Sequence, residues 1–248
     1  MHVKRKNELW MKIIGSIFGL VFVISTTYSI AKMYTYLPLE ALAKQAEDLE
    51  EKAREAFKQG NPQKTIQLLE EAKKLDPQNF IRSIHAGNIY RDMQNWLKAQ
   101  ESYEEAIRLK PGVSTSYELL ALVYAEQRQF SKAEENFKLA LKFDPKNISS
   151  LHNSGVLYLQ QKKFREAEKQ FLEVLKIDAK YMDAYRNLGM LYRLEGNHLR
   201  TMNAFRRYLE LNTSASKPEV EEIRGFIREA KENFEKEQSK FKYQKPNS

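Results

Sequence analysis

The sequence contains no cysteine. A chain without thiols forms no disulfide, no zinc-thiolate site and no lipoprotein attachment, and it has no cysteine nucleophile. Several catalytic signatures are also missing, among them the G-x-S-x-G elbow, the phosphate-binding loop and the H-E-x-x-H motif. No convergent polar cluster replaces them, so we expect a protein that is not an enzyme, with no catalytic residues and no cofactor.

A basic nucleic-acid-binding stripe is absent as well. The formal net charge is +8 at pH 7, but acidic and basic residues alternate in mixed runs such as 101–110 and 166–176. Mixed runs are typical of solvated helix faces with i, i+4 pairs. Because no contiguous basic stripe with interleaved aromatic residues occurs, we expect no nucleic-acid partner.

What the sequence does contain is an internal repeat of 34 residues. Four tyrosines keep this interval: Tyr90, Tyr124, Tyr158 and Tyr192. A small residue lies three positions before each of them: Gly87, Ala121, Gly155 and Gly189. Prolines follow the same interval: Pro77, Pro111 and Pro145. A repeat of this length determines the architecture before any local pattern does.

Within one repeat the apolar spacing predicts two helices. The first has one face formed by residues spaced i, i+3, i+4 and i+7: Tyr117, Leu120, Ala121 and Tyr124. The second has the same period: Phe130, Ala133, Phe137, Ala140 and Leu141. Polar residues 126–129 form the turn between them, and Pro145 ends the second helix. One helix pair cannot bury its apolar side alone, so we expect the pairs to stack.

These residues resemble the tetratricopeptide repeat family. The resemblance is close in residues 80–113: Gly87, Tyr90, Trp96, Ala99, Tyr103, Ala106 and Pro111. It weakens in the last repeat, which has Thr201 and Thr213 where the family has alanine and proline, and in the first repeat. The resemblance implies an all-α fold, a right-handed superhelix of helix-turn-helix units over residues 46–215. The five implied repeats are 46–79, 80–113, 114–147, 148–181 and 182–215.

An uncharged stretch near the N-terminus predicts a membrane segment. Residues 13–31 hold 19 residues without charge, close to the ~20 that cross a bilayer as a helix. The preceding basic residues are Lys4, Arg5, Lys6 and Lys12. By the positive-inside rule they keep the N-terminus cytoplasmic and place the repeats on the extracytoplasmic side, periplasmic if the protein is bacterial. The sequence thus predicts a single-pass membrane protein with residues 1–36 as cytoplasmic tip and transmembrane anchor.

A cleaved signal peptide is the alternative reading of the same stretch. Residues 1–31 would then be removed after the small-x-small site Ser29-Ile30-Ala31. We favour the anchor, because Ile30 and Met33 prolong the apolar character. Residues 38–45 form a short helical lead-in that begins near Pro38 and joins the first repeat directly.

The C-terminal part predicts a capping helix over residues 216–240. Ser216 and Glu219 form an S-x-x-E capping box. The helix that follows has one apolar stripe: Val220, Ile223, Ile227, Ala230 and Phe234. Repeat arrays need such a terminal helix with a polar outer face. Residues 241–248 have the composition of a disordered tail.

If the first helices bury their tyrosine face, their opposite faces line a concave groove. The predicted groove residues are Ile84, His85, Asn88, Arg91, Glu118, Leu119, Leu122, His152, Asn153, Val156, Arg186, Asn187, Met190 and Arg193. Stacking does not require the apolar members, so we expect them to bind a peptide or helical segment of another protein. The alternative is that the C-terminal helix or a second copy of the chain covers them.

Two known groove chemistries can be compared with these positions. Asn153 and Asn187 occupy one place in adjacent repeats, which resembles the asparagine ladder of the O-linked N-acetylglucosamine transferase type, although with two rungs only. The Lys/Asn/Arg clamp of chaperone-tail receptors is not present, and Asp183 would repel a carboxylate. His85 and His152 lie two repeats apart, on the order of 20 Å from helix spacing, which excludes a common metal ion.

The sequence therefore predicts a non-catalytic scaffold that recruits another protein near a membrane, in envelope, secretion or complex assembly. Three alternatives remain open at this point. One is an organelle import receptor with cytosolic repeats, and another is a self-associating scaffold or homo-oligomer. The third is an accessory subunit of an enzyme.

Overall fold

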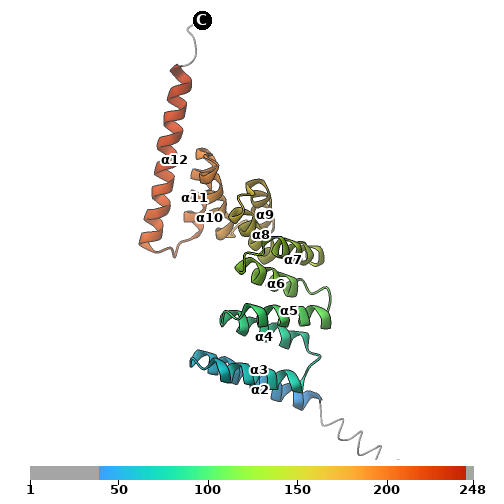
Figure 1. Ribbon diagram of the computed structural model, residues 1–248. Helices are drawn as coiled ribbons and strands as arrows, with labels where there is room; N and C mark the ends of the chain where they lie inside the picture. Colours follow the sequence, from blue (N-terminus) through green and yellow to red (C-terminus); the bar gives the residue numbers. More distant parts are fainter. Residues whose placement is uncertain (1–38, 244–248) are drawn as a thin grey trace, which may run out of the picture. The chain divides into compact units, whose positions relative to one another are not determined.

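The computed structural model describes residues 39–243, and every regular element among them is an α-helix (Figure 1). The first is α2 (Leu39–Lys58). The others, in chain order, are α3 (Pro62–Leu75), α4 (Phe80–Asp92), α5 (Trp96–Leu109), α6 (Ser114–Glu126), α7 (Phe130–Phe143), α8 (Ile148–Gln160), α9 (Phe164–Ile177), α10 (Met182–Leu194), α11 (His198–Leu211) and α12 (Lys217–Tyr243). The predicted all-α class is confirmed for this part of the chain.

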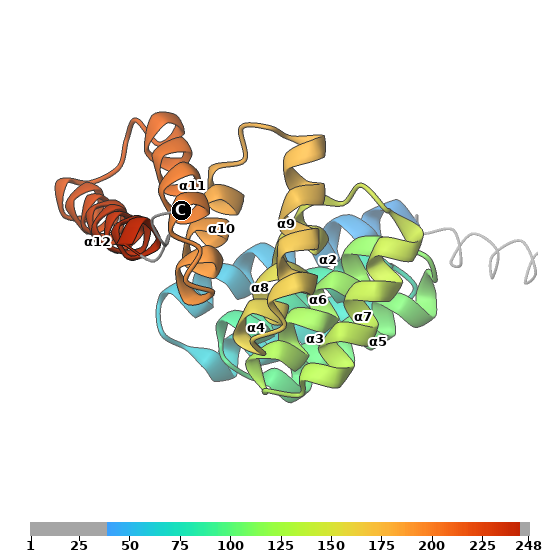
Figure 2. The same cartoon turned by 90° about the horizontal axis from the view of Figure 1, so that it is seen from above.

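The chain divides into two compact units, Met1–Ile89 and Tyr90–Ser248, with the boundary inside α4. In the first unit α2 packs against α3. In the second unit the pairs are α6 with α7, α8 with α9 and α10 with α11, and each pair contacts the next along the chain. Figure 2 shows these pairs from above. Their helices are confirmed as the stacked helix pairs of the predicted fold class.

A glycine allows the two helices of a pair to approach closely. A Cβ atom added to Gly155 of α8 would lie 2.6 Å from the ring of Phe171 on α9. A Cβ atom on Gly189 of α10 would lie 2.6 Å from the ring of Phe205 on α11. Both rings are fully buried. Each ring therefore fills the space that a side chain on the first helix would occupy, which fixes the faces that the two helices turn to each other.

Each repeat also reuses one turn between its first and second helix. Five of the residues with left-handed backbone conformation recur every 34 positions: Gly60, Gln94, Arg128, Lys162 and Gly196. In the turn after α8, the N–H of Lys163 donates to Tyr158 and that of Lys162 donates to Leu159. This pair of bonds is the Schellman motif, which satisfies the last carbonyls of a helix. The tyrosine of the repeat thus supplies the carbonyl that closes its own helix.

The residue that closes the first helix is also the N-cap of the second. Asn61, Asn95 and Asn197 accept a hydrogen bond from a backbone N–H three residues later. Gln129 and Lys163 stand at the same place before α7 and α9 and make no such bond. Asparagine is a preferred N-cap because its short side chain reaches that donor. The repeats therefore differ in how well their second helices begin.

The repeated tyrosines tie successive pairs together. The hydroxyl of Tyr192 on α10 donates to Glu168 on α9 at 2.7 Å, and Arg200 on α11 bonds the same carboxylate at 2.7 Å. The Arg200 guanidinium also lies 5.2 Å from the Tyr192 ring centroid. Burial, together with the bond to Glu168, raises the pKa of Tyr192. The hydroxyl therefore remains a donor at neutral pH.

Helix α12 lies antiparallel along α11. Tyr208, near the end of α11, donates to Glu219 in the first turn of α12. His198, at the start of α11, lies 3.4 Å from Glu237 far along α12. Ile223 is buried between the two helices with the rings of Phe205 and Tyr208. The helix continues to Tyr243, beyond the end at residue 240 that the sequence suggested.

The predicted membrane localisation requires correction. No helix among residues 39–243 is both long and apolar enough to cross a bilayer. The two longest, α2 and α12, carry charged residues along their whole length. This finding contradicts the prediction of a single-pass membrane protein with extracytoplasmic repeats. The stretch 13–31, on which the predicted anchor or signal peptide rested, lies outside the described residues.

Replacing Gly189 with alanine tests the close approach of the helix pairs. The added methyl group would overlap the Phe205 ring, so we expect the free energy of unfolding to fall by about 1–3 kcal/mol. The measurement is chemical denaturation followed by circular dichroism. Gly225→Ala on α12 is the matched control, since its Cβ would meet nothing within 4 Å. That variant should gain about 0.5–1 kcal/mol from helix propensity. Equal effects of the two substitutions would contradict the packing argument.

Replacing Gln129 with asparagine tests the missing N-cap. The new side chain would accept a backbone N–H in the first turn of α7, as Asn197 does for α11. We expect the free energy of unfolding to rise by about 1 kcal/mol. The converse variant, Asn197→Ala, should lose a similar amount in the same denaturation experiment. No gain from Gln129→Asn would show that the turn geometry alone determines the start of the helix.

Candidate functional site

The predicted groove residues are divided between the two units. Ile84, His85 and Asn88 lie on the part of α4 in the first unit, and Arg91 lies on the part in the second. The others lie on α6, α8 and α10, whose neighbouring members contact one another. We call the surface that these three helices share the first-helix face. It is defined by Glu118, Leu119, Leu122, His152, Asn153, Val156, Arg186, Asn187, Met190 and Arg193.

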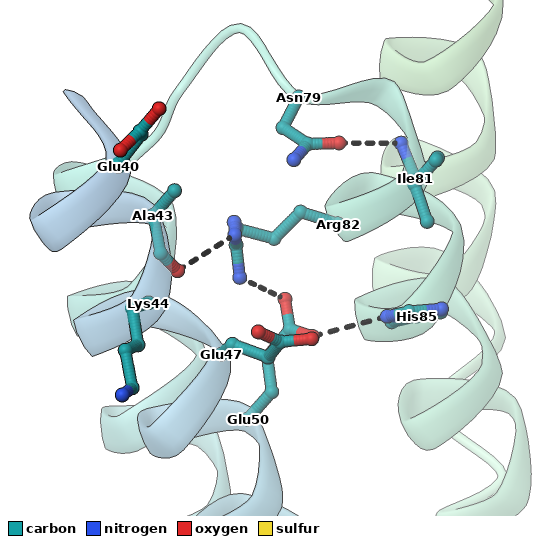
Figure 3. A pocket seen from close by; sticks show the side chains of 9 residues that line it. All are labelled: Glu40, Ala43, Lys44, Glu47, Glu50, Asn79, Ile81, Arg82 and His85. Carbon is teal, nitrogen blue, oxygen red and sulfur yellow. Dashed lines mark hydrogen bonds and ion pairs between the residues drawn. The ribbon is translucent and has the colours of Figure 1, made fainter.

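In the first unit a pocket of about 530 Å³ opens between α2 and α4 (Figure 3). Its lining residues are Glu40, Ala43, Lys44, Glu47, Glu50, Asn79, Ile81, Arg82 and His85. Figure 3 shows the Arg82 side chain reaching from α4 to α2. It donates to Glu50 at 2.7 Å and to the Ala43 carbonyl at 3.3 Å. The predicted groove residue His85 is tied to the other Glu50 oxygen at 3.0 Å.

Arg82 and Glu50 neutralise each other at the wall of this pocket, so this pair leaves no net charge for a ligand. Both side chains are more than nine-tenths buried, and Asp76 accepts a further bond from Arg82 at 3.1 Å. A buried pair of this kind is costly to break, because either charge left alone would remain desolvated. The arginine therefore joins α2, the end of α3 and α4 within the first unit.

On the first-helix face, Glu118 of α6 accepts hydrogen bonds from three side chains of α8. Ser149 donates at 2.5 Å, Ser150 at 3.2 Å and Asn153 at 3.3 Å. Glu118 is only 7% exposed. The residue was predicted as a groove residue, and the structure places it at the junction of two first helices. Ser149 and Ser150 were not predicted, and they lie three and two residues before the groove residue His152.

A second polar contact joins α8 to α10. The ring nitrogen Nε2 of His152 lies 2.9 Å from the Asn187 amide nitrogen. The imidazole also packs beside Tyr181 and Phe171, with ring centroids 5.3 and 5.9 Å apart. Burial lowers the pKa of His152, while Asp183 acts in the opposite direction. The ring is therefore neutral at pH 7 and serves as a hydrogen-bonding group rather than a charge.

Three of the polar contacts between first helices share one register. The pairs Glu50 and His85, Glu118 and Asn153, and His152 and Asn187 are each separated by 35 residues. A residue of one repeat thus meets the residue one position later in the next repeat. Both asparagines of the predicted ladder use their amide nitrogen in these contacts.

Helix α12 covers part of the predicted groove in the last repeat. Arg193 of α10 donates to Glu229 at 3.0 Å, and its guanidinium lies 4.4 Å from the Phe226 ring centroid. Met190 packs against the core that α11 and α12 share. First helices begin every 34 residues at 80, 114, 148 and 182, and α12 begins one residue after the next position in that series. It therefore takes the place of a sixth first helix, which this spacing could have predicted.

The part of the first-helix face that α12 leaves uncovered includes α6 and α8, and Arg186 of α10 is also exposed. Leu119, Leu122 and Val156 are all half-buried. At one end of this surface is a polar hollow of about 480 Å³ lined by Ala125, Glu126, Arg128, Phe130 and Gln160. Glu126 and Gln160 were not among the predicted residues, although they occupy one repeat position 34 residues apart. The surface thus combines an apolar strip with polar groups at both ends.

The described part of the chain contains no cluster of side chains that could bind a metal ion. Among residues 39–243, no group of three His, Asp or Glu side chains lies close enough to hold an ion. The two predicted groove histidines belong to different units and each has a partner of its own.

Two models of one family match the sequence. Both are described as tetratricopeptide repeat, one over residues 80–146 and one over residues 153–216, and together they cover just over half of the chain. The chain belongs to the tetratricopeptide repeat family. Tetratricopeptide repeats are generally non-enzymatic and typically bind protein partners.

A curated protein is similar over a short segment. It is named "Probable UDP-N-acetylglucosamine–peptide N-acetylglucosaminyltransferase SPINDLY", from Solanum lycopersicum, and is 40% identical over 52 residues. The match covers 21% of this chain and 6% of that protein. The shared segment is a tetratricopeptide repeat segment, so the similarity concerns the repeats and not the enzyme as a whole.

Solved structures with the same fold cover most of the chain. PilW, a type IV pilus biogenesis factor, has a TM-score of 0.62 at 20% identity, over 81% of this chain and 95% of its own. A tetratricopeptide repeat protein from Parabacteroides merdae has a TM-score of 0.61 at 22% identity, over 78% of each chain. YrrB, described as having an unusual peptide-binding site, has a TM-score of 0.56 at 18% identity, over 78% and 99%. At these identities the likeness shows the fold.

Replacing Arg82 with alanine tests its role in the first unit. The change leaves Glu50 buried without its cation, so we expect the first unit to lose about 3–5 kcal/mol of stability. Amide hydrogen exchange across residues 39–89 of the full chain measures that loss. Arg54→Ala is the control, since its pair with Glu51 is exposed and should contribute nothing measurable. Unchanged exchange in Arg82→Ala would show that the pair does not hold the helices together.

Proposed function

We propose that the protein is a non-catalytic interaction scaffold whose first-helix face binds a peptide or helical segment of a partner protein. The observation that carries the proposal is the strip of half-buried apolar residues on α6 and α8. Leu119 and Leu122 have no packing role that repeat stacking requires, and polar groups border them. Apolar strips with polar edges mark interaction surfaces.

The C-terminal end of the repeat array supports the proposal that the first-helix face binds a partner. Helix α12 already lies against α10 through Phe226, where the next first helix of a longer array would lie. The array is thereby closed at its C-terminal side, while the face of α6 and α8 stays uncovered by this helix. Family membership supports a protein ligand, and YrrB shows that a protein with a similar fold is described as having a peptide-binding site. Helix-in-groove and extended-peptide binding both use such surfaces.

Photo-crosslinking followed by affinity measurement tests the proposal. A photoreactive amino acid at Leu122 should attach to a specific partner, which is then purified. We expect Val156→Glu to weaken that partner's binding at least about tenfold, because a carboxylate in the apolar strip must be desolvated. Leu97→Glu on α5 is the matched control, since Leu97 is 66% exposed and lies away from this face. It should bind like the unaltered protein.

Two results would count against the assignment. The first is crosslinking at Leu122 that is no more specific than crosslinking at exposed Lys138 of α7. The second is equal affinity of the partner for Val156→Glu and for the unaltered chain, with helical content retained in both.

A further inference from the structure

The carboxylate of Glu118 is the buried charge of the first-helix face. It is 7% exposed, and its three hydrogen-bond donors are the hydroxyls of Ser149 and Ser150 and the amide of Asn153. All three donors are neutral. A carboxylate offers about four lone-pair positions, so the donors leave room for one more. A buried charge that only dipoles stabilise remains costly compared with one that faces a cation.

In the first unit, the glutamate at the equivalent repeat position has a cationic partner. Glu50 stands two repeat lengths before Glu118 and is likewise buried. Its partners are Arg82 at 2.7 Å and His85 at 3.0 Å. The α8 residues at the places of Arg82 and His85 are Ser150 and Asn153. The two sites therefore have one geometry, but only the first contains its own cation.

No side chain of the described helices supplies the missing charge. Among residues 39–243, no lysine, arginine or histidine forms an ion pair with Glu118 or with Asp183. Tyr181 lies within the field of both carboxylates, and its pKa is raised by burial first and then by Asp183, Asp178 and Glu118. The neighbouring imidazole of His152 is neutral at pH 7. The carboxylates of Glu118 and Asp183 thus both act on Tyr181, and neither has an ion-pair partner among the described residues.

The apolar strip continues directly from this carboxylate. Leu122 lies one helical turn after Glu118 on α6, and Val156 lies one turn after His152 on α8. A partner segment that contacts both Glu118 and the apolar strip must therefore carry a cation next to apolar side chains. We infer that Glu118 receives the ammonium or guanidinium group of a lysine or arginine in the partner segment, beside an apolar residue that packs on Leu122 and Val156. This inference rests on the proposed function and specifies the chemistry of its ligand.

Selection from a random peptide library displayed on phage, with the full chain as target, tests the inference. We expect selected sequences to carry lysine or arginine at one position, with apolar residues within about four positions of it. The same selection against Glu118→Gln should lose the basic preference and keep the apolar one. Glu195→Gln is the matched control, since it makes the same change at an exposed residue beyond α10. Its selected sequences should match those of the unaltered chain.

A two-by-two comparison then measures the contact itself. The best selected peptide is synthesised with lysine and with norleucine at the basic position, and fluorescence anisotropy gives the affinity of each for the unaltered chain and for Glu118→Gln. Each single change should weaken binding at least about tenfold, and the second change should add less than about threefold. A merely structural role of Glu118 would weaken both peptides equally. Circular dichroism confirms that the variant keeps its helices.

The outcomes separate the two proposals. If no sequence is enriched, both the proposed function and this inference are wrong. Apolar sequences without a basic residue, or a basic preference that survives Glu118→Gln, would overturn the inference and leave the binding function intact. Self-association of the unaltered chain in light scattering, lost in Glu118→Gln, would replace the partner segment with a second copy and also overturn it.

Discussion

The close contact between a glycine of the first helix and a phenylalanine of the second, in the pairs α8 with α9 and α10 with α11, is the constraint on which the rest depends. At Gly155 and Gly189 the ring occupies the volume of a Cβ atom, so only one rotation of the helices about their axes is compatible with the pair. That rotation buries the tyrosine of the first helix and directs the residues on the opposite side outward. The first-helix face is therefore a consequence of core packing and not of the polar residues that it displays.

The repeated tyrosine of the first helices contacts the elements on either side of it. Its carbonyl closes its own helix in the Schellman turn, and its hydroxyl reaches a glutamate of the preceding pair, as Tyr192 does with Glu168. The backbone of this position thus takes part in the turn within a repeat, and its side chain makes the contact between repeats. The backbone hydrogen bonds of this turn hold Arg128 and Lys162 in a left-handed conformation that costs a side chain about 1–2 kcal/mol. The surrounding bonds determine the turn more strongly than the local preference of those residues.

The helix pairs could be predicted from the sequence because their signals are local and periodic. Spacings of three and four residues within a helix, and of 34 between repeats, identify the elements and their buried sides. The site was only partly predictable. Glu118 was placed on the correct helix, but its burial depends on Ser149 and Ser150 of the next helix, which spacing within α6 does not reveal. Arg193 and Met190 were predicted to line a groove for a partner, with cover by the C-terminal helix as the alternative, because spacing along the chain does not show where α12 packs.

The two equivalent glutamates show how one architecture can give a closed contact and an open one. A first-helix carboxylate between two repeats needs donors from the following repeat, and the fold supplies three positions for them. Where one donor is an arginine, as with Glu50, the charge is neutralised inside the chain and the contact contributes to holding the helices together. Where the donors are serine and asparagine, as with Glu118, the same carboxylate is oriented but its charge is not neutralised. An external cation gains most binding free energy at a carboxylate that is already oriented but not yet neutralised. The cost of orienting the carboxylate has then been met on folding.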